Sequence, residues 1–165
     1  MGLDHGISIR KRGRGKSKYK SVLDMRKCNQ IHGWFLRNCI FREYDDPREW
    51  NGDYFQIFKQ DIIDLYNDIN YVLDNSELVD GRVQVCKIPK RFLFWTYWRA
   101  EYEPGKVIKN PKVAKEVLPT TDGFYFGRLE YDGLYYEQLE YVKKGLEKLK
   151  DIDEEEYAIY YWGWW

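Results

Sequence analysis

The segment FQIFKQDIIDLYNDINYV, residues 55–72, carries the strongest periodic signal in the chain and anchors the expected fold. Its apolar residues recur at intervals of three and four, which is the spacing of one face of an α-helix. The residues on this face are Phe55, Phe58, Ile62, Leu65, Ile69 and Val72. The stretch therefore predicts a long amphipathic helix whose acidic opposite face lies in water.

The residues that precede this helix predict a strand, a loop and another helix. Residues 3–10 alternate apolar and polar side chains, a period of two that is typical of a half-buried strand. Residues 11–20 combine glycines with mutually repelling cations, which predicts a mobile loop. From Ser21, a candidate N-cap, apolar residues again recur at three and four, which predicts a helix through Met25, Cys28, Ile31, Phe35 and Cys39.

The residues that follow predict further strands and helices. Strands are expected at residues 83–88, 92–102, 123–127 and 157–164. A turn is expected at Pro104-Gly105. Helices are expected from Asn110-Pro111 to the residue before Pro119, and over residues 135–149.

This order of elements predicts an α+β fold. We expect residues 1–165 to form a single compact domain, in which a mainly antiparallel sheet packs against two or three helices around an aromatic-rich core. The stretch at about residues 80–110 is rich in strand-forming residues, and we expect it to be a β insertion in this domain.

The composition fits a globular chain that is neither transmembrane nor disordered. Hydrophobic residues make up 44% of the 165 residues and charged residues 33%, and no apolar run is long enough for a membrane helix. The 27 basic and 27 acidic side chains cancel, although they alternate in blocks of +9 (1–42), −8 (43–86), +6 (87–115) and −7 (116–165). No continuous basic face is indicated, so nucleic acid is not expected as a partner. Because the sequence has no long apolar run, no membrane partner is expected either.

Catalytic and metal-binding motifs are absent from the sequence. It contains no nucleophile elbow, no HExxH motif and no P-loop, and its only histidines are His5 and His32. We therefore expect no metal and no cofactor, and we prefer a non-catalytic role while leaving an enzymatic one open. The odd number of cysteines argues against disulfides and predicts small buried hydrophobic residues at Cys28, Cys39 and Cys86.

Aromatic side chains are unusually abundant, with 7 Trp, 15 Tyr and 8 Phe. In nucleotide pockets an aromatic ring stacks on the base, and Arg or Lys binds the phosphate. We therefore expect a small nucleotide ligand. The candidate ligand-binding residues are Arg10, His32, Trp34, Trp95, Arg99, Tyr125, Arg128 and Tyr131.

Some of these candidates have a structural alternative. His32 lies on an apolar stripe, so it fits a core histidine as well as a pocket residue. The glycine-flanked run at residues 123–127 fits a core strand, in which Tyr125 faces away from Phe126. The strand at 92–102 carries aromatic residues on both faces, so one face needs a ligand or a second subunit, and we expect a homo-oligomer.

Three stretches of the chain form a recognisable set. They are Met1-Gly2-Leu3-Asp4, then Cys28-Asn29-Gln30-Ile31-His32-Gly33-Trp34-Phe35, and then Leu118-Pro119-Thr120-Thr121-Asp122-Gly123-Phe124-Tyr125-Phe126-Gly127 with Tyr131-Asp132 and Tyr135-Tyr136 after it. Together they resemble a family of small proteins from tailed phages and prophages. The sequence departs from the family pattern at His5-Gly6, and residues 80–110 resemble an insertion peculiar to this branch.

The resemblance implies a phage anti-defence protein in the cytoplasm of the infected bacterial host. Together with the rings and cations, it predicts a protein that sequesters a nucleotide-derived immune signal, either a cyclic nucleotide or an ADP-ribose derivative, without cleaving it. One alternative is an enzyme that degrades such a signal, with His32 or His5 as general acid and base. Another is a protein-interaction module that inhibits a host factor through the aromatic insertion.

Overall fold

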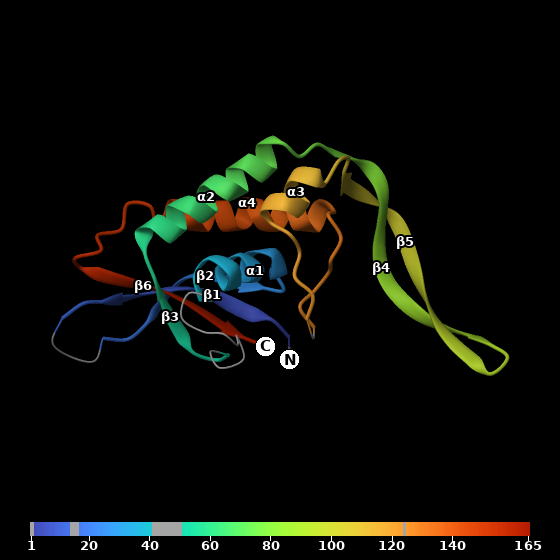
Figure 1. The fold of residues 1–165 in the computed structure, drawn as a ribbon, viewed down its shortest axis with the longest axis horizontal. Coiled ribbons are helices and arrows are strands. Elements are labelled where there is room, and N and C mark those ends of the chain that lie inside the picture. Colours follow the sequence, from blue (N-terminus) through green and yellow to red (C-terminus); the bar gives the residue numbers. More distant parts are fainter. Residues whose placement is uncertain (1, 14–16, 41–50, 124) are drawn as a thin grey trace.

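The computed structural model describes residues 2–13, 17–40, 51–123 and 125–165, and Figure 1 shows their arrangement. The elements are β1 (Asp4–Lys11), β2 (Lys20–Arg26), α1 (Asn29–Asn38), β3 (Tyr54–Ile57), α2 (Lys59–Asp74), β4 (Leu78–Phe92), β5 (Trp95–Ile108), α3 (Lys112–Val117), α4 (Gly133–Glu147) and β6 (Tyr157–Trp164). The predicted α+β class is confirmed. Among the described residues, no helix is long and apolar enough to cross a bilayer.

A four-stranded sheet forms one layer of the molecule. Its strand order is β2-β1-β6-β3, and every neighbouring pair is antiparallel. Strands β1 and β6 pair from Asp4 opposite Trp164 to Lys11 opposite Tyr157, which brings the two ends of the chain side by side (Figure 1). The predicted strands at residues 3–10 and 157–164 are therefore confirmed.

Helix α1 lies between this sheet and the outer helices α2 and α4. Its residues from Asn29 to Phe35 are all buried. On the sheet side, the ring of Phe35 stacks on Tyr161 of β6 with 4.0 Å between the centroids. On the other side, Trp34 donates its Nε1–H to Asp68 of α2 at 2.7 Å. The hydrophobic core thus continues through α1 from the sheet to the outer helices.

The predicted helix from Ser21 is wrong over its first half, because Lys20–Arg26 form strand β2 at the edge of the sheet. Leu23 and Met25 are buried while Asp24 between them is exposed, which is the period of two that a strand requires. Pairing with β1 satisfies this backbone, and α1 begins only after it. The spacing of three and four arose from joining a short strand pattern to a short helix pattern.

The predicted helix at residues 55–72 is confirmed as α2 except at its start. Tyr54–Ile57 instead form β3, which pairs with β6 at the other edge of the sheet. Helix α2 begins at Lys59, where the carboxylate of Asp61 accepts a hydrogen bond from the backbone N–H of Phe58 at 2.9 Å. The acidic residue in the first turn therefore marks the boundary that the apolar repeat concealed.

Strands β4 and β5 form a separate two-stranded sheet that extends away from the rest of the molecule (Figure 1). The strands predicted within residues 80–110 are present and longer than expected. The turn predicted at Pro104-Gly105 is wrong, because both residues pair with β4 inside the hairpin. We call the four-stranded sheet and the four helices the body of the molecule. The hairpin joins the body at its base, where the N–H of Ile108 donates to the carbonyl of Tyr131 at 3.0 Å.

None of the three cysteines, all of which lie among the described residues, forms a disulfide. Cys28 and Cys39 are buried, as predicted, and burial raises the pKa of the Cys28 thiol to about 12, so this thiol stays protonated. The prediction is wrong for Cys86, which is exposed on β4 with its Sγ 3.5 Å from a carboxylate oxygen of Glu101.

Candidate functional site

A cleft opens at the N-terminal end of α4, beside the start of α1. Its cavity of about 400 Å³ falls in the size range of small-ligand pockets. We call it the α4 cleft, and it is lined by Lys27, Gln30, Tyr125, Gly127, Arg128, Glu130, Asp132, Leu134, Tyr135 and Gln138. Its walls thus combine an exposed ring with cations, carboxylates and amides.

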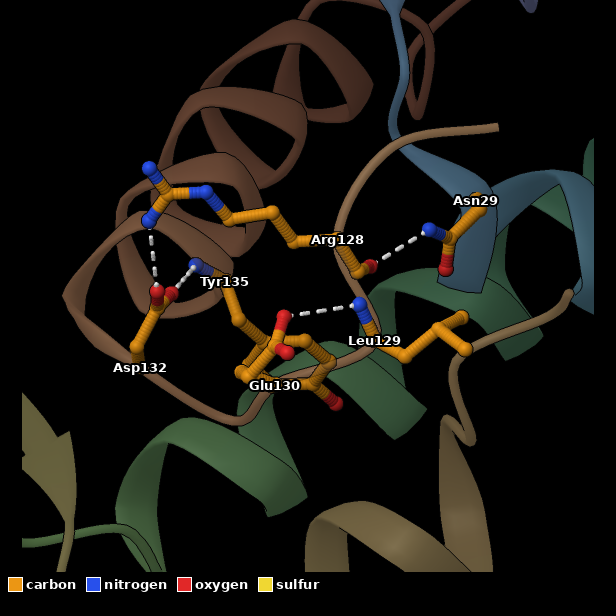
Figure 2. Close-up of polar contacts among 6 residues, drawn as sticks. All are labelled: Asn29, Arg128, Leu129, Glu130, Asp132 and Tyr135. Carbon is orange, nitrogen blue, oxygen red and sulfur yellow. Dashed lines mark hydrogen bonds and ion pairs between the residues drawn. The ribbon is translucent and has the colours of Figure 1, made fainter. Parts of the chain in front are cut away.

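Asp132 organises this end of the helix (Figure 2). Its Oδ1 accepts a hydrogen bond from the backbone N–H of Tyr135 at 3.1 Å and so caps α4. Its Oδ2 accepts a hydrogen bond from Nη1 of Arg128, also at 3.1 Å. The side chain of Asp132 is 3% exposed and that of Arg128 is 39% exposed. The buried carboxylate therefore orients a guanidinium whose other N–H groups remain accessible to a ligand.

Asn29, at the start of α1, fastens the segment that forms the opposite wall. Its Nδ2 donates to the carbonyl of Arg128 at 2.8 Å (Figure 2) and to the carbonyl of Phe126 at 3.3 Å. Its Oδ1 accepts from the backbone N–H of Thr121 at 3.0 Å. One buried amide thus makes hydrogen bonds to three backbone groups of an irregular segment, which has no helix or strand to satisfy them.

Tyr125 lines the cleft and has a left-handed backbone conformation. Its φ is +57°, which is rare for a bulky residue, and the residue is 60% exposed. At Gly127 φ is +109°, and a Cβ there would come within 2.8 Å of the carbonyl oxygen of Lys27. The strand predicted at residues 123–127 is therefore wrong, and its member Phe124 lies outside the described residues. A strained backbone under an exposed ring is typical of ligand-binding segments.

The formal charges that line the cleft cancel. Lys27 and Arg128 are cationic, whereas Glu130 and Asp132 are acidic. Asp132 is already paired with Arg128, and an oxygen of Glu130 accepts from the backbone N–H of Leu129 at 3.1 Å. The cleft therefore offers cations to an anionic group and a carboxylate to a hydroxyl or amino group.

The floor of the cleft is neutral and hydrogen-bonded. Gln30 of α1 is buried and donates its Nε2–H to Oε1 of Gln138 in α4 at 3.0 Å. The hydroxyl of Tyr135 donates to the carbonyl of Leu118 at 2.9 Å, and burial raises its pKa above the ordinary range, so it stays protonated.

Two predicted site residues, His32 and Trp34, lie in the core and do not line the cleft. The hydroxyl of Tyr161 lies 2.8 Å from Nδ1 of His32 and 2.9 Å from Nδ1 of His5. Because a hydroxyl has one proton, it can donate to at most one of the two rings, so at least one of the two neutral histidines carries its proton on Nδ1 and donates it to Tyr161. The indole of Trp34 is buried against Asp68 of α2.

Burial lowers the pKa of His32 to about 3. It also lowers the pKa of His5 well below 6.5, and the neighbouring His32 adds to this shift. Both rings are fully shielded from solvent. Of the two interpretations of His32, the core histidine is therefore the one that fits its position.

The remaining predicted residues are scattered. Tyr131 uses its hydroxyl to accept from the backbone N–H of Thr120 at 3.1 Å, beside but outside the cleft lining. Arg10 donates its Nε–H to Ser17 at 3.3 Å, on the sheet. Trp95 and Arg99 lie on the hairpin. Of the predicted set, the structure brings only Tyr125 and Arg128 together in the α4 cleft.

Some residues that line the cleft or anchor its wall were not selected from the sequence. Gln30 in the lining and Asn29 behind it belong to the Asn-Gln-Ile-His stretch, so their signal was present in the motif but was assigned to its histidine and tryptophan. Lys27 and Gln138 carried no signal, since an isolated exposed lysine and a helical glutamine occur on any surface. Their role depends on the way that α1 and α4 converge.

Among the described residues, no group of three or more side chains is placed to hold a metal ion. No protein-family model, curated protein or solved structure matches this chain. The resemblance to phage proteins therefore stays a prediction.

Proposed function

We propose that the α4 cleft binds a small nucleotide-derived ligand and holds it intact. The observation that carries the proposal is the juxtaposition of the exposed ring of Tyr125 with Lys27 and Arg128 around one cavity. A ring of this kind stacks on a base, and the cations bind phosphate. In the host cytoplasm during phage infection, such a protein would withhold a nucleotide immune signal from its receptor.

The other walls suit the remaining parts of a nucleotide. The carboxylate of Glu130 accepts hydrogen bonds of the kind that ribose hydroxyls donate. The amide pair of Gln30 and Gln138 has donors and acceptors of the kind that read a base edge. A cavity with cations alone would favour inorganic anions, whereas this mixed lining favours an anion that also carries hydrogen-bond donors.

The dimensions of the cleft restrict the ligand. A volume of about 400 Å³ lies near the lower end of the range for small-ligand pockets. It therefore favours a ligand with one base, such as a cyclic mononucleotide or an ADP-ribose derivative. A second base would lie outside the cleft, where it gains no enclosing contacts.

The positions of the histidines support binding over cleavage. Phosphodiester or glycosidic cleavage without a metal needs an acid and a base within hydrogen-bond reach of the bond. His32 and His5 are buried around Tyr161 and do not line the cleft. The degrading enzyme considered above therefore loses the residues assigned to its chemistry.

Isothermal titration of the full chain tests the proposal with cyclic mononucleotides, cyclic dinucleotides and ADP-ribose derivatives as probes. We expect at least one probe with a single base to bind. Tyr125→Ala and Arg128→Ala should each weaken its affinity about tenfold or more, because each removes a stacking or charge-assisted contact.

Matched controls come from exposed residues of the same types outside the cleft. Tyr71→Ala on α2 and Arg82→Ala on β4 should leave the affinity unchanged. Failure of the whole panel to bind, or equal losses in the cleft variants and these controls, would refute the proposal.

A further inference from the structure

The far half of the β4–β5 hairpin, residues 85–100, carries large side chains that nothing in the described structure covers. We call this half the arm. At its turn, Phe94 is 93% exposed and Trp95 is 79% exposed. Monomeric proteins rarely leave adjoining rings in water, so such a patch marks an interaction surface. The arm contributes nothing to the α4 cleft and raises a separate question about its partner.

Charge on the arm has one sign. Lys87, Lys90, Arg91 and Arg99 lie within residues 85–100, and no Asp or Glu does. The nearest acidic residue on the hairpin is Glu101, which directly follows the arm on β5. The arm therefore complements an anionic partner, although the whole chain is neutral.

The side chains change in a fixed order from the turn inward. Leu93, Phe94 and Trp95 form an apolar tip without a charge. Behind the tip come the amphipathic rings Tyr97 and Trp98, at the same level as the cations. In membrane-interface proteins apolar groups lie deepest, Trp and Tyr lie at the headgroup boundary, and basic groups lie at the phosphates.

Both faces of the arm share this order. In the hairpin register Lys90 lies opposite Tyr97 and Pro89 lies opposite Trp98. Cross-strand partners share one face and the next pair along lies on the other. Rings and cations are thus distributed around the hairpin, which suits entry by the tip and does not suit lying flat on one apolar face.

We propose that the arm inserts its tip into the surface of an anionic lipid bilayer. The apolar tip would enter the boundary between headgroups and acyl chains, about 5–10 Å deep as for other interfacial elements. Lys90, Arg91 and Arg99 would then contact lipid phosphates. A β4 strand of 15 residues spans about 50 Å, which holds the rest of the molecule and its cleft clear of the bilayer (Figure 1).

Other partners fit the arm less well. A nucleic acid would favour cations along the whole contact, including the tip, because its phosphates line both sides of a groove. A second copy of the chain would favour one apolar face, because an isologous interface matches one patch to itself. Neither explains why the apolar tip is uncharged and the cations are set back from it.

Co-sedimentation of the full chain with vesicles tests this proposal. We expect binding to vesicles of phosphatidylglycerol in phosphatidylcholine, weakening as salt is added, and binding at least about tenfold weaker to phosphatidylcholine alone. Arg99→Gln should weaken binding about fivefold, equivalent to about 1 kcal/mol. The double change Phe94→Ser and Trp95→Ser should abolish it while the far-UV circular dichroism stays unchanged.

The control variant is Tyr71→Ser on α2, an exposed ring outside the arm, which should bind vesicles like the unchanged chain. Equal binding to charged and neutral vesicles would overturn the proposal, and so would binding that survives the loss of the tip rings. Binding to single-stranded DNA but not to vesicles would point to a nucleic acid instead. Self-association that depends on the tip, without vesicle binding, would point to a second copy.

Discussion

The body and the arm place aromatic residues of the same types in opposite environments, buried in the body and exposed to solvent in the arm. In the body, Phe35, Trp34 and Tyr161 are buried, and both the indole N–H of Trp34 and the hydroxyl of Tyr161 are hydrogen-bonded. In the arm, Phe94 and Trp95 face solvent, on a hairpin whose contacts with the described part of the body lie near its base. The first arrangement stabilises the fold, whereas the second adds little to it and is available for binding. An aromatic-rich composition alone therefore does not tell core from contact surface.

The largest contrast should appear when one ring is removed from each region. Phe35→Ala leaves a cavity beside Tyr161 in the core and should lower the free energy of unfolding by about 3–5 kcal/mol. Trp95→Ala should change it by less than about 0.5 kcal/mol, because the side chain is exposed. Chemical denaturation followed by circular dichroism measures both, and similar losses in the two variants would contradict the division.

Acid should weaken the body through its buried histidines. The folded state keeps His5 and His32 neutral because burial lowers both pKa values, that of His32 to about 3. The unfolded chain binds protons on both below about pH 6.5, so stability falls as the pH falls below this value, by up to about 1.4 kcal/mol per pH unit for each histidine.

Denaturation midpoints measured at a series of pH values above and below about 6.5 test this. His32→Asn removes one titrating group and should make the dependence shallower. A stability that does not change, or that rises, on acidification would show that the imidazoles are solvated in the folded state.

Asn29 should matter to the body more than an amide at the surface does. Asn29→Ala leaves the carbonyl of Phe126 and the partly buried N–H of Thr121 without these partners and should cost about 2 kcal/mol. It should also weaken ligand binding in the α4 cleft, since the wall with Arg128 loses its anchor. Asn75→Ala, an exposed helix-end amide, is the control and should cost less than about 0.5 kcal/mol. Equal losses of unfolding free energy in the two variants would show that Asn29 does not anchor this segment.

Removing the arm should have the smallest effect on the fold. Replacing residues 85–101 by Asn-Gly closes the hairpin between Gln84 and Tyr102, which are paired in the structure. We expect the thermal unfolding midpoint and the ligand affinity of the cleft to stay unchanged. A large loss of either would show that the arm supports the body.

Much of the fold was predictable because its elements carry simple periodic patterns. The strands at residues 3–10 and 157–164 and most of α2 were identified, since one face of each is buried. The errors lie where a short strand adjoins a helix, at β2 and β3. Each edge strand forms because a central strand needs a hydrogen-bonded neighbour, and that demand comes from distant segments.

The candidate site was predictable only in part. Tyr125 and Arg128 were found because rings and cations are the groups that nucleotides need. His32 and Trp34 share those properties but face the core, and the apolar stripe of α1 could not separate the two roles before α2 and α4 were placed around it. The left-handed turn at Tyr125 had no sequence signal, because a tyrosine rarely adopts it.

The most direct test of the central claim identifies what the α4 cleft releases. The full chain is incubated with the nucleotide probes, separated from unbound probe by gel filtration and then heated. The released molecule is identified by mass spectrometry. We predict near-stoichiometric recovery of one unaltered probe from the unchanged chain, and none from the double variant Tyr125→Ala and Arg128→Ala. Recovery of a cleaved product, or of no probe at all, would contradict the account.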